Sequence, residues 1–211
     1  MPEIEGHFFK GGRRGWVRVE FTGGDTLELR REVFADFGFG NGSVVDADEL
    51  DAAVNESDRR HGRSVALRFF RERPRSEQEI RLRLRREKLE PETIDSLVAD
   101  FTNQGFLNDA DFARAWVGSR TNLRPKGVFL IRRELREKGV DDDHIDAALA
   151  QDYPGELEVA RPLAEARATA LASEDWVRFR QKLGVYLKRR GFANDTIERL
   201  VAEGWEIHGG E

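Results

Sequence analysis

The sequence predicts a mainly α-helical protein, in which an elongated tandem array of three three-helix, helix-turn-helix-like repeats follows a small N-terminal β-hairpin and helix region. The first observation is a phrase that occurs three times, at 80–98, 131–149 and 183–201, with one apolar pattern. The second is that residues 16–29 alternate as strands do, whereas no convincing strand pattern follows Arg63. Repeats of this length are typical of proteins whose units stack along the chain.

Residues 1–62 are expected to form an N-terminal extension with a β-hairpin and a helix. Apolar residues alternate in GWVRVEF and in TLELR, on either side of a Gly-Gly-Asp turn, which is typical of a hairpin. A short helix over about 31–37 follows, and Asp46 or Asp48 is expected to cap the next helix. The stretch FGFGNGS between them lacks the strand and the helix that flank a nucleotide-binding loop, so it predicts an ordinary turn.

The repeated phrase has the same apolar frame in each copy when the copies are aligned on Leu84, Leu135 and Leu187. An apolar residue stands four positions before the aligned leucine and five, ten and fourteen positions after it, which predicts two helices that face one core. The recurring residues are Ile80, Ile131 and Leu183; Leu89, Val140 and Phe192; Ile94, Ile145 and Ile197; and Val98, Leu149 and Val201. Another amphipathic helix precedes each phrase, so we expect three-helix repeats over 63–107, 108–153 and 154–211.

The link between the two helices of each phrase also recurs. Gly139 and Gly191 follow a basic residue at the end of the first helix, where a glycine can adopt a positive φ. In the first copy Glu87-Lys88 occupies this place, so the glycine is missing. Pro91 is expected in the first turn of the next helix, and the corresponding cap positions are Asp141 and Ala193.

Other helix starts and the aromatic residues complete the prediction. Ser76 and Glu79 form a capping box, and Ser173 or Glu174 is expected to start the helix that leads into the third phrase. Aromatic residues at helical spacing favour core packing over base stacking; those assigned to cores are Trp116, Trp176 and Phe179, while Trp205 fits either role.

Composition limits the function classes. The chain has 211 residues and a net charge of −5, with 18 basic against 12 acidic residues in 61–140 and an acidic excess on both sides. Such a basic centre suits a polyanion or an acidic protein surface, although most of these charges could simply solvate helix faces. There is no cysteine, which excludes disulfides and thiolate chemistry. No signal peptide or long apolar run is recognisable, so a cytoplasmic location is expected.

Catalytic and metal-binding signals are weak. The four histidines lie in different segments without the spacing of metal ligands, and no nucleophile or phosphate-loop motif stands out. His144 follows three aspartates in a first helical turn, where capping explains the cluster better than a cation does. We therefore expect no enzymatic activity, no metal and no cofactor.

The residues of 64–120 resemble the recombination regulator family RecX. The run GFLND at 105–109 is followed by Phe112-Ala113, Trp116 and Arg120, and then by the helix end LREKG at 135–139. The resemblance extends over about 64–205, and the N-terminal part is similar to an extension that some members carry. The missing glycine at 87–88 and the link at 120–128, which has no acidic residue, depart from the family pattern and concern the geometry of the helix ends.

This resemblance implies a non-enzymatic regulator in DNA repair, homologous recombination and the SOS response. RecX-like proteins bind the RecA recombinase filament on single-stranded DNA and inhibit its ATPase, coprotease and strand-exchange activities. The alternative is an independent nucleic-acid-binding protein without sequence preference, with weak binding to single- or double-stranded DNA. We expect a monomer with no membrane partner.

Basic residues at helical spacing are the candidate contacts with the filament or DNA. Arg81, Arg85 and Lys88 should form one stripe, Arg132 and Arg136 repeat it, and it thins in the third copy, where Gly184 replaces the first arginine. The full candidate set is Arg81, Arg85, Arg86, Lys88, Arg120, Lys126, Arg132, Arg133, Arg136, Lys188 and Arg189.

Overall fold

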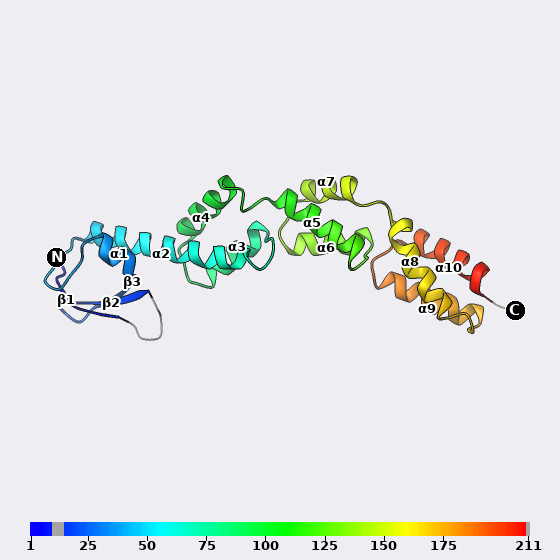
Figure 1. The fold of residues 1–211 in the computed structure, drawn as a ribbon, viewed down its shortest axis with the longest axis horizontal. Helices are drawn as coiled ribbons and strands as arrows, with labels where there is room; N and C mark the ends of the chain where they lie inside the picture. The colour runs from blue at the N-terminus through cyan, green and yellow to red at the C-terminus, as the bar shows by residue number, and fades with distance from the viewer. Residues whose placement is uncertain (10–14, 210–211) are drawn as a thin grey trace. The chain divides into compact units, whose positions relative to one another are not determined.

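Figure 1 shows the computed structural model, which describes residues 1–9 and 15–209. Over these residues, three strands precede ten α-helices, so the mainly helical class with a small N-terminal sheet is confirmed. The chain divides into two compact units, one of Met1–Arg75 with Ile80–Leu107 and the other of Ser76–Glu79 with Asn108–Glu211. Among the described residues, no helix combines the length and the apolar content that crossing a bilayer requires.

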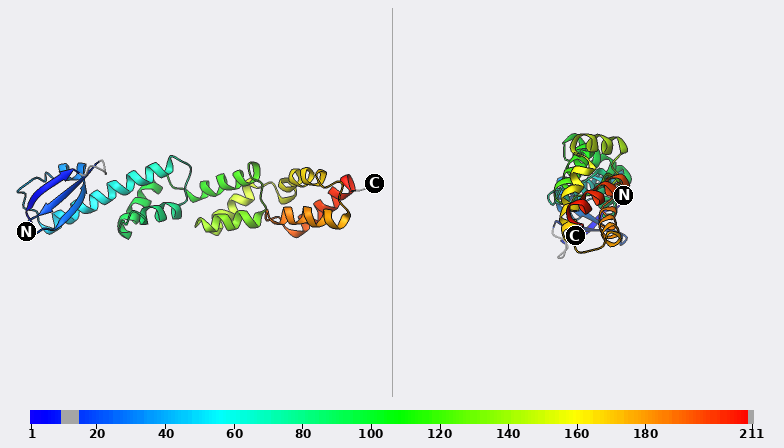
Figure 2. Two further views of the ribbon diagram at one scale, coloured as in Figure 1. Left: turned by 90° about the horizontal axis from the view of Figure 1, so that it is seen from below. Right: turned by 90° about the vertical axis from the view of Figure 1, so that its right-hand side faces the viewer.

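The N-terminal sheet has three antiparallel strands in the order β1 (Ile4–Phe9), β2 (Trp16–Phe21) and β3 (Thr26–Arg30). The predicted hairpin is β2–β3, in which Val17 pairs with Leu29. β1 was not predicted, because its sequence IEGHFF contains a glycine and ends in two exposed phenylalanines instead of alternating. Figure 2 shows the three strands side by side, with the short helix α1 (Arg31–Asp36) and the start of α2 next to them.

Helix α2 (Ala47–Phe70) begins where the sequence predicted, because the Asp46 side chain accepts a hydrogen bond from the Glu49 amide at 2.7 Å. It then continues for 24 residues, whereas two separate helices were expected on either side of residue 62. Gly62 lies inside this helix, where an added Cβ would meet the side chains of Leu89 and Leu97 at 2.6 Å. The glycine therefore permits close packing of the two leucines against α2 rather than marking the end of a helix.

Three helices enclose each of the three C-terminal hydrophobic cores. The first bundle uses the second half of α2 with α3 (Glu77–Arg85) and α4 (Pro91–Asn103). The second uses α5 (Asp109–Asn122), α6 (Val128–Glu137) and α7 (Asp142–Asp152), and the third uses α8 (Glu156–Thr169), α9 (Trp176–Lys188) and α10 (Asn194–His208). Every residue of the recurring apolar frame is buried, with at most 8% of its surface exposed. The division into four domains at 62, 107 and 153 stays a prediction, and its first boundary falls inside α2.

The ends of α3, α6 and α9 share one backbone conformation. Gly139 and Gly191 have φ of 76° and 83°, as the prediction for a glycine at these positions requires. Lys88 occupies the equivalent place in the first bundle with φ of 62°, the only non-glycine residue with a positive φ among the described residues. The missing glycine therefore leaves the turn unchanged and forces a lysine into a conformation that L-residues rarely adopt.

The remaining helix starts follow the predictions with one exception. Ser76 and Glu79 form the expected capping box, through bonds between each side chain and the other's amide at 3.3 and 3.4 Å. Asp175, rather than Ser173 or Glu174, caps α9 by accepting from the Arg178 amide at 3.0 Å. Trp176 is the first residue of this helix and is exposed, so the prediction that it belongs to the core is wrong.

The tryptophans differ in their environments. Phe179 is fully buried as predicted, whereas Trp176 is 40% exposed and lies with its ring centroid 5.4 Å from that of Trp205. Trp205 in turn lies against Phe179 at 5.2 Å and packs at the edge of the third core. Trp116 packs against the second core beside Phe112, in agreement with its assignment as a packing residue.

Candidate partner-binding surface

The candidate cations of the first bundle divide into one paired residue and three unpaired ones. Arg81 on α3 forms an ion pair with Asp95 on α4 and so connects the two helices. Arg85, Arg86 and Lys88 are exposed, and no carboxylate of the described residues lies within ion-pair distance of them. The predicted stripe is therefore available to a partner only at its C-terminal end.

The second bundle uses its equivalent arginines in the same way. Arg132 on α6 pairs with Asp146 on α7, and both residues lie 51 positions after Arg81 and Asp95. The Arg136 Nε atom donates to Asp142 Oδ1 at 2.7 Å, and this hydrogen bond lowers the pKa of Asp142. We call the junction between the second and third helices of a bundle its seam; ion pairs cross the seam in the first and second bundles.

Arg133 and the two candidates of the third bundle do not pair across a seam in the described residues. The exposed Arg133 has a weak contact with Glu137 one turn later on α6, at 3.6 Å. In the third bundle, Lys188 and Arg189 are exposed, and within the described residues neither has a carboxylate partner. The unpaired candidates are thus found at the ends of α3 and α9.

Arg120 and Lys126 belong to a half-buried network around Glu134 on α6. Glu134 accepts from the Arg120 Nε atom at 2.7 Å, from the Trp116 indole at 2.9 Å and from the Lys126 ammonium group. Burial of the Glu134 carboxylate would raise its pKa, but the hydrogen bonds from Lys126, Arg120 and Trp116 lower it overall. This network connects α5, the following link and α6, so the two cations have a structural role whatever else they contact.

Trp116 is enclosed by cations as well as by the core. The Arg120 guanidinium carbon lies 4.1 Å from the centre of its ring and the Lys138 ammonium nitrogen 4.5 Å from it, which are cation–π distances. Lys138 also forms an ion pair with Glu79 at 2.7 Å, and its carbonyl accepts from the Ser76 hydroxyl at 2.7 Å. The capping-box segment 76–79 is therefore fastened to the second bundle within the same compact unit.

Asp109 at the start of α5 also contacts the segment 76–79. Its carboxylate accepts a hydrogen bond from the Glu77 amide at 2.9 Å. Burial raises the pKa of Asp109, whereas this hydrogen bond lowers it in part. Together with Gly139, whose added Cβ would meet Gln78 Oε1 at 2.3 Å, the contact shows how tightly residues 76–79 lie against the second bundle.

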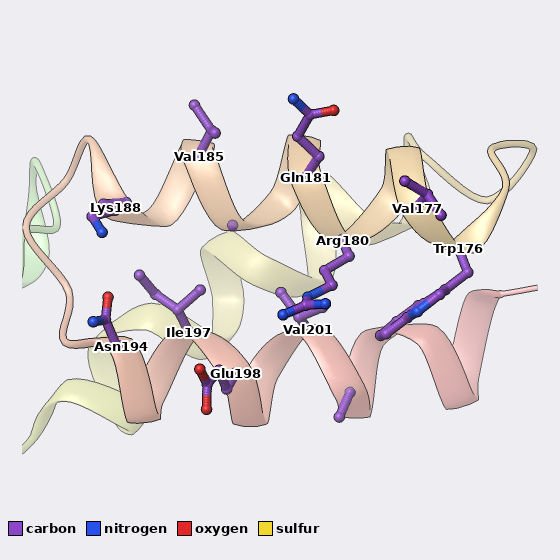
Figure 3. A pocket seen from close by; sticks show the side chains of 12 residues that line it. Trp176, Val177, Arg180, Gln181, Val185, Lys188, Asn194, Ile197, Glu198 and Val201 are labelled. Carbon is purple, nitrogen blue, oxygen red and sulfur yellow. The ribbon is translucent and has the colours of Figure 1, made fainter.

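The seam of the third bundle is open. A groove of about 770 Å³ lies between α9 and α10, and Figure 3 shows that Trp176, Arg180 and Lys188 extend from α9 toward α10 while Gln181 and Val185 point away. The arginine that crosses the other seams is replaced here by Gly184. From the sequence, Gly184 indicated only a thinner basic stripe; the groove was not predicted, although the loss of the arginine at this position was the signal that could have revealed it.

Titratable side chains are not arranged for metal binding in the part of the chain that the structure describes. No group of three or more His, Asp or Glu residues there is close enough to hold an ion. His61 Nε2 instead lies 2.9 Å from Glu87 Oε2, and the pKa of Glu87 is lowered chiefly by this hydrogen bond.

Comparison with known proteins relates this chain to one family. A family model described as the second three-helix domain of RecX matches residues 108–149, which is the second bundle. The regulatory protein RecX of Prosthecochloris aestuarii is 33% identical over 150 residues, covering 71% of this chain and 97% of that protein. The regulatory protein RecX of Thermobifida fusca is 35% identical over 151 residues, covering 71% and 81%, and that of Leuconostoc mesenteroides is 30% identical over 192 residues, covering 90% and 71%.

Two solved structures share the fold. A crystal structure of regulatory protein RecX superposes with a TM-score of 0.55 at 21% identity and covers 100% of this chain and 95% of that one. The crystal structure of RecX from Lactobacillus salivarius gives a TM-score of 0.62 at 24% identity over 69% of this chain and 96% of that one. The relatives of 33% and 35% identity show that the chain belongs to the RecX family, so the predicted resemblance is confirmed, and the two solved structures show the same fold.

Proposed function

Because this chain belongs to the RecX family of regulatory proteins, we propose that it binds the filament that RecA forms on single-stranded DNA and inhibits the ATPase, coprotease and strand-exchange activities of that filament. The observation that supports the proposal best is the similarity to proteins named regulatory protein RecX over at least 70% of this chain. In this role the protein acts without catalysis, as a cytoplasmic monomer.

The tandem bundles fit a partner that repeats along an axis. Each bundle buries the same apolar frame and therefore forms a similar unit of about fifty residues. A filament presents identical subunits at regular intervals, so weak contacts from successive bundles add up on one polymer. Binding to several subunits at once would restrain the motions between subunits that a cycle of hydrolysis needs.

The candidate cations differ in whether they already pair with a carboxylate of this chain, and this difference ranks them as contacts for the partner. The five unpaired cations are proposed to contact the partner first: Arg85, Arg86, Lys88, Lys188 and Arg189. The seam arginines and Arg133 would have to exchange an intramolecular carboxylate for one of the partner. Arg120 and Lys126 would also leave Glu134 with only the hydrogen bond from the Trp116 indole. An exposed contact contributes about 1 kcal/mol or less, so the set acts collectively.

The test is a titration of the protein into RecA, single-stranded DNA and ATP while hydrolysis is followed. Inhibition at well below one protein per RecA subunit supports filament binding. Inhibition that appears only when the DNA is saturated supports the alternative, competition by an independent DNA-binding protein. If the wild-type protein does not inhibit ATP hydrolysis by RecA at any ratio, the proposal is contradicted.

A charge-reversal variant tests the ranking of the cations. Replacing Arg85, Arg86 and Lys88 by Glu should weaken inhibition at least tenfold while the helical circular dichroism is retained. Arg71→Glu is the matched control, because Arg71 is an exposed cation of the same unit outside the candidate set. Equal inhibition by the triple variant and the control would show that another face meets the filament.

A further inference from the structure

The three seams have equivalent positions but different chemistry. The seam arginine and its aspartate are Arg81 and Asp95 in the first bundle, and Arg132 and Asp146 in the second. At the same positions of the third bundle stand Gly184 and Glu198. The second cross-seam pair of the second bundle, Arg136 with Asp142, is likewise replaced by Lys188 and Asn194, which cannot form an ion pair. The third seam thus lacks both ion pairs, and the groove of about 770 Å³ lies there.

The backbone does not require a glycine at position 184, and the effect of this residue is to leave space between α9 and α10. It lies inside α9 without a positive φ, and the nearest atom to an added Cβ is Ile197 Cγ2 at 3.7 Å, an ordinary contact. A side chain would therefore fit, and a glycine within a helix costs about 0.5–1 kcal/mol relative to alanine. The absence of a side chain here keeps the centre of the groove open.

Charges at the groove are left without partners. Glu198 is exposed, and no cation of the described residues lies within ion-pair distance of it. Arg180 and Lys188 on the facing helix are also exposed and unpaired over the same residues. Figure 3 shows these three side chains around the groove, with Ile197 and Val201 between them on α10.

Apolar surface accompanies these charges. Trp176 is 40% exposed, Val177 is 71% exposed and Val185 is 45% exposed, all on α9 along or beside the groove. Exposed apolar residues grouped with unpaired charges of both signs are typical of a surface that binds a protein segment. A nucleic acid would fit less well, because Glu198 would repel its phosphates.

We propose that the groove between α9 and α10 binds a segment of the filament's protein subunit in which an arginine is flanked by apolar residues. This proposal rests on the proposed function and names the contact within it. The arginine of the segment takes the place that Arg81 and Arg132 occupy in the other seams and donates to Glu198. Apolar side chains of the segment cover Trp176 and Val177, and a carboxylate of the segment pairs with Arg180 or Lys188.

The decisive variant is Gly184→Arg, which restores the seam arginine of the other two bundles. Its side chain should cross the seam to Glu198, fill the groove and weaken inhibition of RecA ATP hydrolysis more than tenfold. Gly184→Ala controls for the gain in helix propensity, since its methyl group contacts only Ile197 and leaves the groove open. Gln151→Arg controls for the added charge at an exposed site on α7 of the same unit. Both controls should inhibit as the wild type does.

A second variant tests the charge. Glu198→Gln keeps the shape of the side chain but removes the acceptor charge, and it should weaken inhibition by up to about fivefold, because an exposed ion pair contributes about 1 kcal/mol or less. A single-cysteine variant, Asn194→Cys, gives a unique labelling site that lines the groove, because the chain has no cysteine. A photocrosslinker at this position should join the protein to RecA when filament is present.

The outcomes separate the groove from the function. Equal inhibition of RecA by the wild-type protein and by Gly184→Arg would overturn the groove proposal and leave the proposed function intact. If Gly184→Arg loses binding to single-stranded DNA without RecA by the same factor as it loses inhibition, the groove binds nucleic acid. A crosslink to a second copy of this chain would show that the groove serves self-association. Either result contradicts the proposal. Wild-type protein that does not inhibit RecA would overturn the proposal together with the proposed function.

Discussion

Removal of the Glu134 carboxylate should destabilise the second bundle strongly. The Glu134 side chain is 17% exposed, and its partners Arg120 and Lys126 are 13% and 27% exposed. In Glu134→Ala both cations and the Trp116 indole lose their acceptor while they stay largely covered. Breaking a buried ion pair by removal of one partner costs 3–5 kcal/mol, and the partial exposure of Lys126 places the expected loss at about 3 kcal/mol.

Glu137→Ala is the matched control on the same helix. Glu137 pairs with Arg133 at 3.6 Å, and the two side chains are 67% and 59% exposed, so its removal should cost less than about 0.5 kcal/mol. Because the chain has two compact units, a single global transition is not assumed. Amide hydrogen exchange in α5 and α6 reports the local free energy of opening directly. Equal exchange in the two variants would refute the assignment of Glu134 as a stabilising acceptor.

Three further predictions concern the same bundles. The lowered folded-state pKa of Glu134 means that its contribution to stability is present above the unfolded pKa of about 4.3 and is lost as pH falls below it, so Glu134→Gln should flatten the fall in stability of the wild type between about pH 5 and 3. Lys88→Gly should raise the local free energy of opening of α3 and α4 by about 0.5–1 kcal/mol, measured by amide hydrogen exchange, because glycine relieves the φ of 62°; a lower free energy of opening would contradict this. Gly139→Ala should lower the local free energy of opening of α6 and α7 by about 2 kcal/mol, since its Cβ would meet Gln78 at a φ of 76°; unchanged hydrogen exchange in these helices would argue against strain.

The apolar frame was predictable because it is local. A helix that covers a core needs apolar residues three and four positions apart, and the three copies confirmed each other's spacing. The hairpin was predictable for the same reason, since β2 and β3 alternate around a glycine turn. β1 was missed because Phe8 and Phe9 are exposed and Gly6 interrupts the pattern.

The continuity of α2 and the pairing of the arginines depend on tertiary contacts. Gly62 looks like a helix breaker in the sequence, but the packing of Leu89 and Leu97 requires it. Whether an exposed arginine pairs with a carboxylate depends on the neighbouring helix, which periodicity does not reveal. The joint recurrence of Arg81 with Asp95 and of Arg132 with Asp146 was nevertheless visible, because both pairs share one spacing.

The recurring frame also explains why the seams are able to differ. The frame residues supply the buried surface of each bundle, whereas an exposed ion pair across a seam contributes about 0.2–1 kcal/mol. The exchange of the seam arginine for Gly184 therefore sacrifices little stability compared with the loss of a frame leucine, which costs about 2–5 kcal/mol on truncation to alanine. Stability thus constrains the inside of the bundles and leaves the seams free to vary. Binding of a partner's side chain at the third seam would need free space and an unpaired charge. Gly184, which the backbone does not require, supplies the space, and Glu198 supplies the charge.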